Sequence, residues 1–112
     1  EYARLLASVD VLAHGSLCET FGFLLAECLA SGTPLVVPDR GGAADLADGL
    51  HAERYGAFDG ASALARALGR LLDRPRAEAS AAAHARAASI PSTRGHFAAL
   101  FDTYAELLAG RA

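Results

Sequence analysis

The chain has 112 residues, 53% of them hydrophobic, a size and composition that suit one small packed domain and exclude a disordered segment. A formal net charge of −3 provides no broad basic surface, so we expect no nucleic-acid partner. The two cysteines, Cys18 and Cys28, are too few for a disulfide framework and have no metal-type spacing with the four histidines.

The first half of the chain alternates predicted helices and strands. Residues 1–8 have the pattern of a helix end, and residues 9–14 form a short apolar run that glycine and serine follow, which predicts a strand. Residues 21–32 favour a helix that ends at a glycine, and residues 33–42 favour a buried strand that runs into a glycine pair. This order predicts a parallel sheet with helices on its faces.

The second half is predicted to be mostly helical. A short helix over residues 43–47 precedes an edge strand near residues 55–58, and residues 61–75 predict a helix ended by proline. The alanine-dense residues 76–89 predict a helix on the surface, since they have little bulk to bury. Residues 96–108 predict a last helix with one apolar stripe. Its members are Phe97, Leu100, Phe101, Tyr104, Leu107 and Leu108.

The stretch ETFGFLLAE, from Glu19 to Glu27, has a carboxylate at each end of an apolar run. If the helix starts near Phe21 or Gly22, Glu19 lies in the loop before it and Glu27 lies one to two turns inside. The unpaired backbone amides between them carry the positive end of the helix dipole, which attracts phosphate, and glycine leaves that approach open. The arrangement suits an elongated ligand with an anionic centre, such as a nucleotide sugar.

Each part of such a ligand has a partner in this interpretation. Glu19 accepts hydrogen bonds from sugar hydroxyls, and Glu27 holds the ribose diol. The amides of Phe21, Gly22 and Phe23 face the diphosphate. A carboxylate can accept two hydroxyl donors at once, and charge-assisted hydrogen bonds are about twice as strong as neutral ones.

Structural alternatives stay open for these residues. Ser16 and Glu19 fit an S-x-x-E capping box, and Glu27 fits an exposed charge on an amphipathic helix. His14 ends a strand near the site, where a histidine more often packs a loop than binds a ligand. Arg40 precedes the glycine pair and could reach an anion, but an exposed arginine beside a turn is commoner. Four further arginines suggest a solvated basic face: Arg66, Arg70, Arg74 and Arg76.

The acidic stretch resembles the E-x7-E motif of the retaining glycosyltransferases of family 4, whose usual form is E-x-F-G-x-x-x-x-E. The matching positions are Glu19, Phe21, Gly22 and Glu27. The similarity continues through residues 28–42, CLASGTPLVVPDRGG, which resemble the segment of that family ending in its Gly-Gly loop. After the glycines this chain has Asp45 where a glutamate is usual, so we expect no ligand contact there.

This resemblance implies a GT-B fold, with two Rossmann-like domains facing across a cleft and the donor at the carboxyl ends of the strands. The chain is then α/β: residues 1–90 are the C-terminal portion of the nucleotide-sugar-binding domain. Residues 91–112 are a C-terminal helix expected to pack toward an upstream N-terminal domain, with part of its stripe exposed in this chain. Because the chain begins with Glu1 in a helical pattern, we expect a piece of a longer protein, inactive alone.

The implied reaction is transfer of a hexosyl group from a nucleoside diphosphate sugar to an acceptor hydroxyl, with retention. The acceptor is a saccharide, a lipid-linked molecule or a small molecule. No cofactor or metal is expected, because the nucleotide sugar is a substrate. Glu19 is the expected catalytic residue, through positioning and electrostatics. The expected donor-binding set is Glu19, Phe21, Gly22, Phe23, Leu24 and Glu27.

Two other functions and one question of location stay open at this point. The chain can belong to another GT-B enzyme, such as a nucleotide-sugar epimerase, or be a non-enzymatic α/β interaction module with structural glutamates. No uninterrupted apolar stretch of about 18 residues is present, so a cytoplasmic protein is expected, with peripheral contact at the inner membrane as an alternative.

Overall fold

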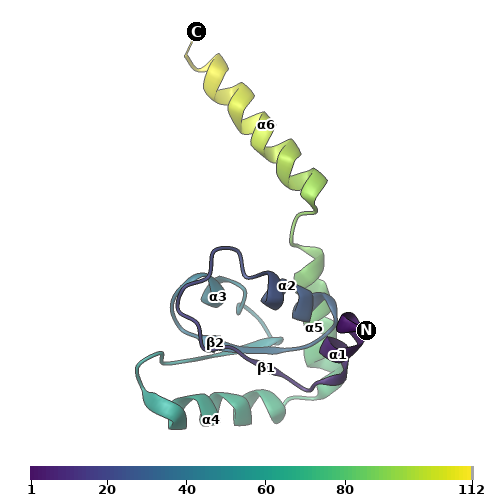
Figure 1. The fold of residues 1–112 in the computed structure, drawn as a ribbon, viewed down its shortest axis with the longest axis vertical. Coiled ribbons are helices and arrows are strands. Elements are labelled where there is room, and N and C mark those ends of the chain that lie inside the picture. The colour runs from purple at the N-terminus through teal and green to yellow at the C-terminus, as the bar shows by residue number, and fades with distance from the viewer. Residues whose placement is uncertain (112) are drawn as a thin grey trace.

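The computed structural model describes residues 1–111 and has an α/β architecture around a short parallel sheet (Figure 1). The strands, in spatial order, are β1 (Leu12–Ala13), β2 (Leu35–Pro38) and β3 (Ala52–Tyr55). The helices are α1 (Tyr2–Ser8), α2 (Phe23–Ala30), α3 (Gly42–Asp45), α4 (Gly60–Leu72), α5 (Arg76–Ala88) and α6 (Thr93–Ala109). Each strand is parallel to its neighbour, which confirms the predicted fold class of a short parallel sheet flanked by helices.

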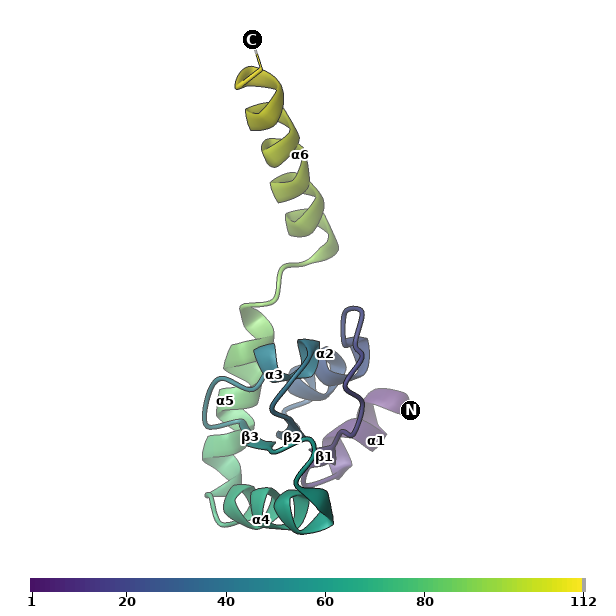
Figure 2. The ribbon, with the colours of Figure 1, turned by 90° about the vertical axis from the view of Figure 1, so that its left-hand side faces the viewer.

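Helices cover both faces of the central strand, β2. Leu35 and Val37 lie in one core cluster with side chains of α1, α2, α3 and α5, whereas Val36 lies in a second cluster with α4. All three side chains are fully buried. Successive side chains of a strand point to opposite faces, so a strand covered on both sides has no polar position. Figure 2 shows the sheet between α4 on one side and α2 and α3 on the other.

Strand β1 is shorter than the predicted residues 9–14. Only Leu12–Ala13 pairs with β2, and the residues before it connect α1 to the sheet. Arg76, at the start of α5, pairs with Asp10 and donates to the carbonyl of Val9 at 3.3 Å. These two residues therefore hold the start of α5, and they lie outside the strand ladder.

The edge strand predicted near residues 55–58 lies three residues earlier, at Ala52–Tyr55. Residues 56–59 form a turn instead, in which the amide of Ala57 donates to Asp39 Oδ1 at 3.2 Å. The aromatic residues Tyr55 and Phe58 favoured the later position on β propensity. Tertiary pairing with β2 overrides that preference, and Tyr55 ends the strand.

The prediction that residues 76–89 lie on the surface is wrong. Helix α5 packs on α2 and buries Ala79 and Ala83, with 3% and 0% of their surfaces exposed. The two helices approach closely because alanine has little bulk. A Cβ at Gly32, just after α2, would lie 2.5 Å from His84 Nε2 and 2.6 Å from Ser80 Oγ of α5. A stripe of small side chains is thus a packing face here.

The predicted solvated basic face is wrong for Arg74, whose side chain is 27% exposed, whereas Arg70 and Arg76 are exposed as predicted, at 53% and 59%. Arg70 and Arg74 of α4 both pair with Glu53 of β3, whose side chain is 15% exposed. Arg74 Nη1 also donates to two main-chain carbonyls at the start of β3, each at 2.9 Å. Arg76 pairs with Asp10. Arg70 and Arg74 thus join α4 to β3, and Arg76 joins the start of α5 to the connection before β1.

Helix α6 projects away from the rest of the molecule and buries none of its residues (Figures 1 and 2). Its stripe is exposed, with Phe97 at 49%, Phe101 at 63% and Leu108 at 68%. This exposure agrees with the expectation for part of the stripe. The division at residue 90 and packing of residues 91–112 on another domain stay predictions, and residue 112 lies outside the described residues. Within residues 1–111, no helix is both long and apolar enough to cross a membrane.

Candidate functional site

The acidic stretch spans the loop after β1 and the first two turns of α2. Helix α2 begins at Phe23, so Glu19 lies in the loop ahead of it and Glu27 lies inside it. Gly22 is the N-cap residue, with φ 75° and no side chain to accept from the first-turn amides. Only glycine adopts this left-handed conformation without strain. The amino end of α2 is therefore free of any side-chain cap.

The capping-box alternative for Glu19 is wrong. Ser16 Oγ accepts from the amide of Cys18 at 3.2 Å and donates to its carbonyl at 3.0 Å, a local turn well before the helix. Since α2 begins at Phe23, Glu19 is not in its first turn and cannot complete a capping box. The Glu19 carboxylate is thus available for other partners.

Glu19 lies between a histidine and a glycine loop. His14 Nε2 is 2.7 Å from Glu19 Oε1, and the Glu19 side chain is 23% exposed. On the other side, a Cβ at Gly42 would lie 3.4 Å from the Glu19 carbonyl and 3.5 Å from its Cβ. The glycine pair therefore packs directly against the acidic loop.

Gly41 shows why the first glycine of that pair is needed. Its φ is 79°, and a Cβ would lie 2.4 Å from the carbonyl oxygen of Leu17. Both the conformation and this close approach exclude larger residues. The two loops at the carboxyl ends of β1 and β2 thus contact each other, as expected for an edge of a parallel sheet that forms a site.

A hollow of about 450 Å³ lies beside Glu19. Thr20 and Phe21 line it from the acidic loop, Asp45 from the end of α3 and Arg86 from α5. Sequence reasoning assigned no ligand contact to Asp45 and did not consider Arg86. The hollow is a size that holds a small-molecule ligand, and it has groups of both charges.

Glu27 is not in this hollow. It is exposed, and the Tyr2 hydroxyl of α1 donates to Glu27 Oε2 at 2.9 Å. This hydrogen bond, with smaller contributions from burial and from the negative charge of Glu27, raises the pKa of Tyr2 above its ordinary value. The hydrogen-bond partner of Glu27 thus comes from α1 and not from its own helix, α2.

The other predicted donor-binding residues lie between the two glutamates. Phe21, Phe23 and Leu24 are 55%, 68% and 40% exposed, and the rings of Phe21 and Phe23 are 4.7 Å apart. Gly22, which lies between these two phenylalanines in the sequence, is buried. The amino end of α2 is therefore flanked by exposed apolar side chains that the domain does not bury.

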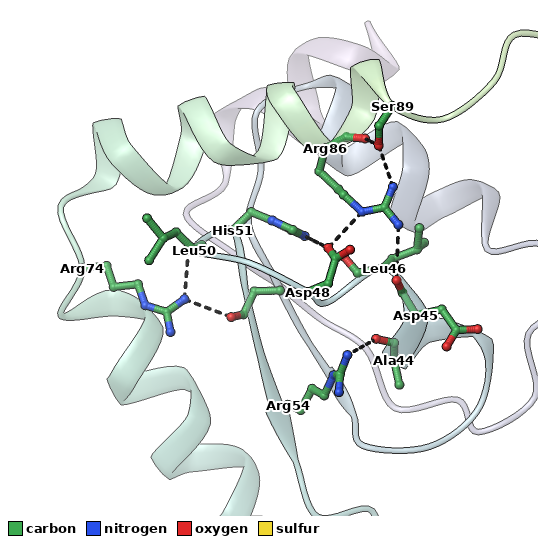
Figure 3. A network of polar contacts seen from close by, with 11 residues as sticks. Ala44, Asp45, Leu46, Asp48, Leu50, His51, Arg54, Arg74, Arg86 and Ser89 are labelled. Carbon is green, nitrogen blue, oxygen red and sulfur yellow. Dashed lines mark hydrogen bonds and ion pairs between the residues drawn. The ribbon is translucent and has the colours of Figure 1, made fainter.

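A polar network holds the hollow in place (Figure 3). Arg86 Nε donates to Asp48 Oδ1 at 2.9 Å, Nη1 to Ser89 Oγ at 2.8 Å and Nη2 to the Asp45 carbonyl at 3.3 Å. These bonds join α5 to the chain after α3. Because Arg86 is committed to them, its guanidinium acts first as a structural support.

His51 belongs to the same network and is 2% exposed. Its Nε2 is 2.6 Å from the Leu46 carbonyl and 3.7 Å from Asp48 Oδ1. Burial alone raises the pKa of Asp48, but the hydrogen bond and charge of Arg86 outweigh it, so this pKa lies below its ordinary value. Asp48 is therefore an ionised partner that links α5 to the loop before β3.

The remaining candidates do not lie in a catalytic cluster. The Arg40 guanidinium lies 5.2 Å from the centre of the Phe58 ring and is 3.8 Å from Asp39. Cys18 is exposed, Cys28 is buried, and neither is in a disulfide. Among the described residues, no three side chains of histidine, cysteine, aspartate or glutamate form a group that could hold a metal. The absence of a cofactor stays a prediction.

Sequence reasoning placed His14 near the site but did not pair it with Glu19, and it missed the partner of Glu27. The pairing of His14 could have been found, because the carboxyl ends of neighbouring strands meet at one edge and His14 follows β1. Tyr2 gave no such signal, since it is 25 residues from Glu27 and meets it only through packing of α1 on α2. Arg86 was hidden in the alanine-dense segment.

The fold and the edge site define a partial Rossmann-like α/β domain, and comparison with known proteins agrees. Residues 1–74, more than half of the chain, match the family described as Glycosyl transferases group 1. The chain belongs to that family. Over 46 residues it is 48% identical to a GDP-mannose-dependent alpha-mannosyltransferase of Mycobacterium tuberculosis (strain CDC 1551 / Oshkosh). The match covers 41% of this chain and 12% of that protein.

Proposed function

We propose that this chain carries the donor-binding site of a retaining glycosyltransferase of family 4. The protein transfers a hexosyl group from a nucleoside diphosphate sugar to an acceptor hydroxyl. The observation that carries the proposal is the position of Glu19, in a loop ahead of an uncapped helix start and beside a hollow of about 450 Å³. Membership of the glycosyl transferases group 1 family supports the same reaction class.

The amino end of α2 is the proposed diphosphate site. The amides of Phe21, Gly22 and Phe23 precede or begin the helix, and no side chain caps it. Their partial positive charge stabilises an anion, and most of all the charge that develops on the leaving diphosphate as the glycosidic bond breaks. The exposed rings of Phe21 and Phe23, with Leu24, limit the access of water to that charge.

The two carboxylates hold the ends of the donor. Glu19 accepts hydrogen bonds from hydroxyls of the sugar and fixes its orientation, an effect on the rate rather than on nucleotide affinity. Glu27 accepts from the ribose hydroxyls, and the carboxylate has acceptor sites to spare beside its bond from Tyr2. The two glutamates thus have separate tasks on one substrate.

The test uses the full-length protein that contains this chain. Purified protein is incubated with GDP-mannose, UDP-glucose or ADP-glucose and with saccharide and lipid acceptors, and release of the nucleoside diphosphate is measured. We test GDP-mannose first because of the name of the mannosyltransferase relative. We expect one donor to support acceptor-dependent release, with the anomeric configuration of the product retained by NMR.

Two results would contradict the proposal. One is the absence of transfer with every donor, and the other is inversion at the anomeric carbon. Conversion of the sugar while it stays on the nucleotide, without any acceptor, would instead favour an epimerase. Reactions without acceptor are therefore the necessary control.

A further inference from the structure

His14 has an unusually fixed position at the edge of the sheet. Its amide donates to the Val36 carbonyl of β2 at 2.8 Å, and its own carbonyl accepts from the Tyr55 hydroxyl of β3 at 3.0 Å. The residue that follows β1 is thus tied to both other strands. A side chain at this position keeps its place relative to the whole sheet.

The imidazole has a buried nitrogen without a satisfied hydrogen bond. His14 Nε2 is buried and lacks a partner with hydrogen-bond geometry, although Glu19 Oε1 lies only 2.7 Å away. A buried donor without a partner is costly, so a small rotation that completes this bond is favourable. Imidazole can donate from Nε2 in its neutral or its charged form.

Glu19, in contrast, has little support from its own segment. The chain between β1 and α2 forms no regular structure. A glutamate side chain has three rotatable bonds, so it orients a substrate well only if another group holds it. His14 is the basic side chain that contacts Glu19 among the described residues.

From this geometry we infer that His14 is a positioning residue, which holds the Glu19 carboxylate toward the sugar end of the donor. This role rests on the function proposed above, and it adds a residue that the acidic motif does not include. His14 acts through Glu19, so it affects turnover more than nucleotide affinity. The competing role is loop packing, in which His14 affects stability and every function together.

The test combines single and double variants of the full-length protein. His14→Leu removes the donor, whereas His14→Gln retains an amide N–H at a similar reach to Nε2. Each is made in the natural sequence, and His14→Leu is also combined with Glu19→Gln. The matched control is His84→Leu, because His84 is an exposed histidine on α5 that does not line the hollow. Turnover, donor KM, calorimetric affinity for the nucleoside diphosphate and Tm are measured for all of them.

We expect His14→Leu to lower kcat about tenfold with donor KM and nucleotide affinity within about twofold of the natural protein. His14→Gln should recover most of the loss. In the Glu19→Gln background, His14→Leu should change kcat less than about twofold, because the group through which it acts is already lost.

The inference is overturned if His14→Leu leaves kcat unchanged, or if its effect adds fully to that of Glu19→Gln. It is also overturned if kcat, nucleotide affinity and Tm fall together and His14→Gln recovers nothing, since this is the pattern of loop packing. If the natural protein transfers sugar and the variants give such a result, the role of His14 is refuted and the proposed function is not. A natural protein that transfers no sugar refutes the proposed function, and the role of His14 with it.

Discussion

The two ends of the acidic stretch have the same residue type and very different surroundings. Glu19 lies beside a hollow, 23% exposed, between the end of β1 and the glycine pair. Glu27 is exposed on α2, with the Tyr2 hydroxyl of α1 as its partner. An enclosed carboxylate suits precise orientation, and an open one suits binding in exchange with water. This difference in surroundings supports the two separate tasks proposed for the glutamates.

Glu19→Gln should produce the largest effect and tests the enclosed end. The charge is lost but the shape is kept, so we expect kcat to fall about a hundredfold as the sugar loses its orientation. Affinity for the free nucleoside diphosphate should stay within about twofold, because it has no sugar. Steady-state kinetics with the cognate donor and calorimetry with the nucleotide measure the two. A parallel loss of nucleotide affinity would mean that the two ends share one task.

Glu27→Gln tests the open end. Loss of a charged hydrogen-bond acceptor costs about 1.5–3 kcal/mol, so the dissociation constants of free nucleotide and donor should both rise roughly tenfold to a hundredfold. The same calorimetric titration measures both. If neither constant changes, Glu27 is an exposed helix charge without a ligand.

Gly22→Ala tests the start of α2, which lies between the two glutamates. Gly22 has φ 75°, and a Cβ there would lie 3.5 Å from Leu25 Cδ1 and 3.7 Å from Leu46 Cδ1. The space is sufficient, so the cost is conformational, about 1–2 kcal/mol of unfolding free energy. Chemical denaturation measures it. Gly69→Ala is the control, since Gly69 lies within α4 with nothing within 4 Å of an added Cβ, and it should not destabilise. Equal changes in unfolding free energy for the two variants would show that the backbone at Gly22 does not need glycine.

Tyr2→Phe should have the smallest effect. It removes the hydroxyl that holds Glu27 Oε2, so Glu27 becomes more mobile and nucleotide affinity should fall about twofold to fivefold. The same bond can be followed by absorbance at high pH. The pKa of Tyr2 is raised, so its phenol should ionise above its usual pH of about 10, and Glu27→Gln should return the transition toward that value. An unchanged titration in Glu27→Gln would contradict the contact.

The sequence predicted the local features well and the tertiary ones poorly. The loop position of Glu19 and the helical position of Glu27 follow from Gly22 and the apolar run after it, which are signals within one turn. The burial of α5 does not follow, because alanines give almost no amphipathic contrast, although Ala79 and Ala83 are buried and α5 packs on α2. A stripe of small side chains can be predicted to be a packing face only when the partner helix is known.

Arg74 was misjudged for a related reason. It donates to the main-chain carbonyls of Leu50 and Ala52, just before and at the start of β3, and residue spacing does not indicate such hydrogen bonds. Charge clusters in a sequence look alike whether they face water or a strand end. Contacts between distant segments, such as Arg86 with Asp48, depend on topology and not on pattern.

The isolation of α6 has a consequence for how the chain unfolds. None of its 17 residues is buried, and its start is held by a single cap, Ser92 Oγ accepting from Gly95 N at 3.1 Å. Most of the stability of a helix in a protein comes from tertiary packing, which α6 lacks in this chain. The amide hydrogens of α6 should therefore exchange with solvent by local fraying, while those of β2 exchange only in global unfolding. Helix α6 and the sheet are then two separate cooperative units on one chain.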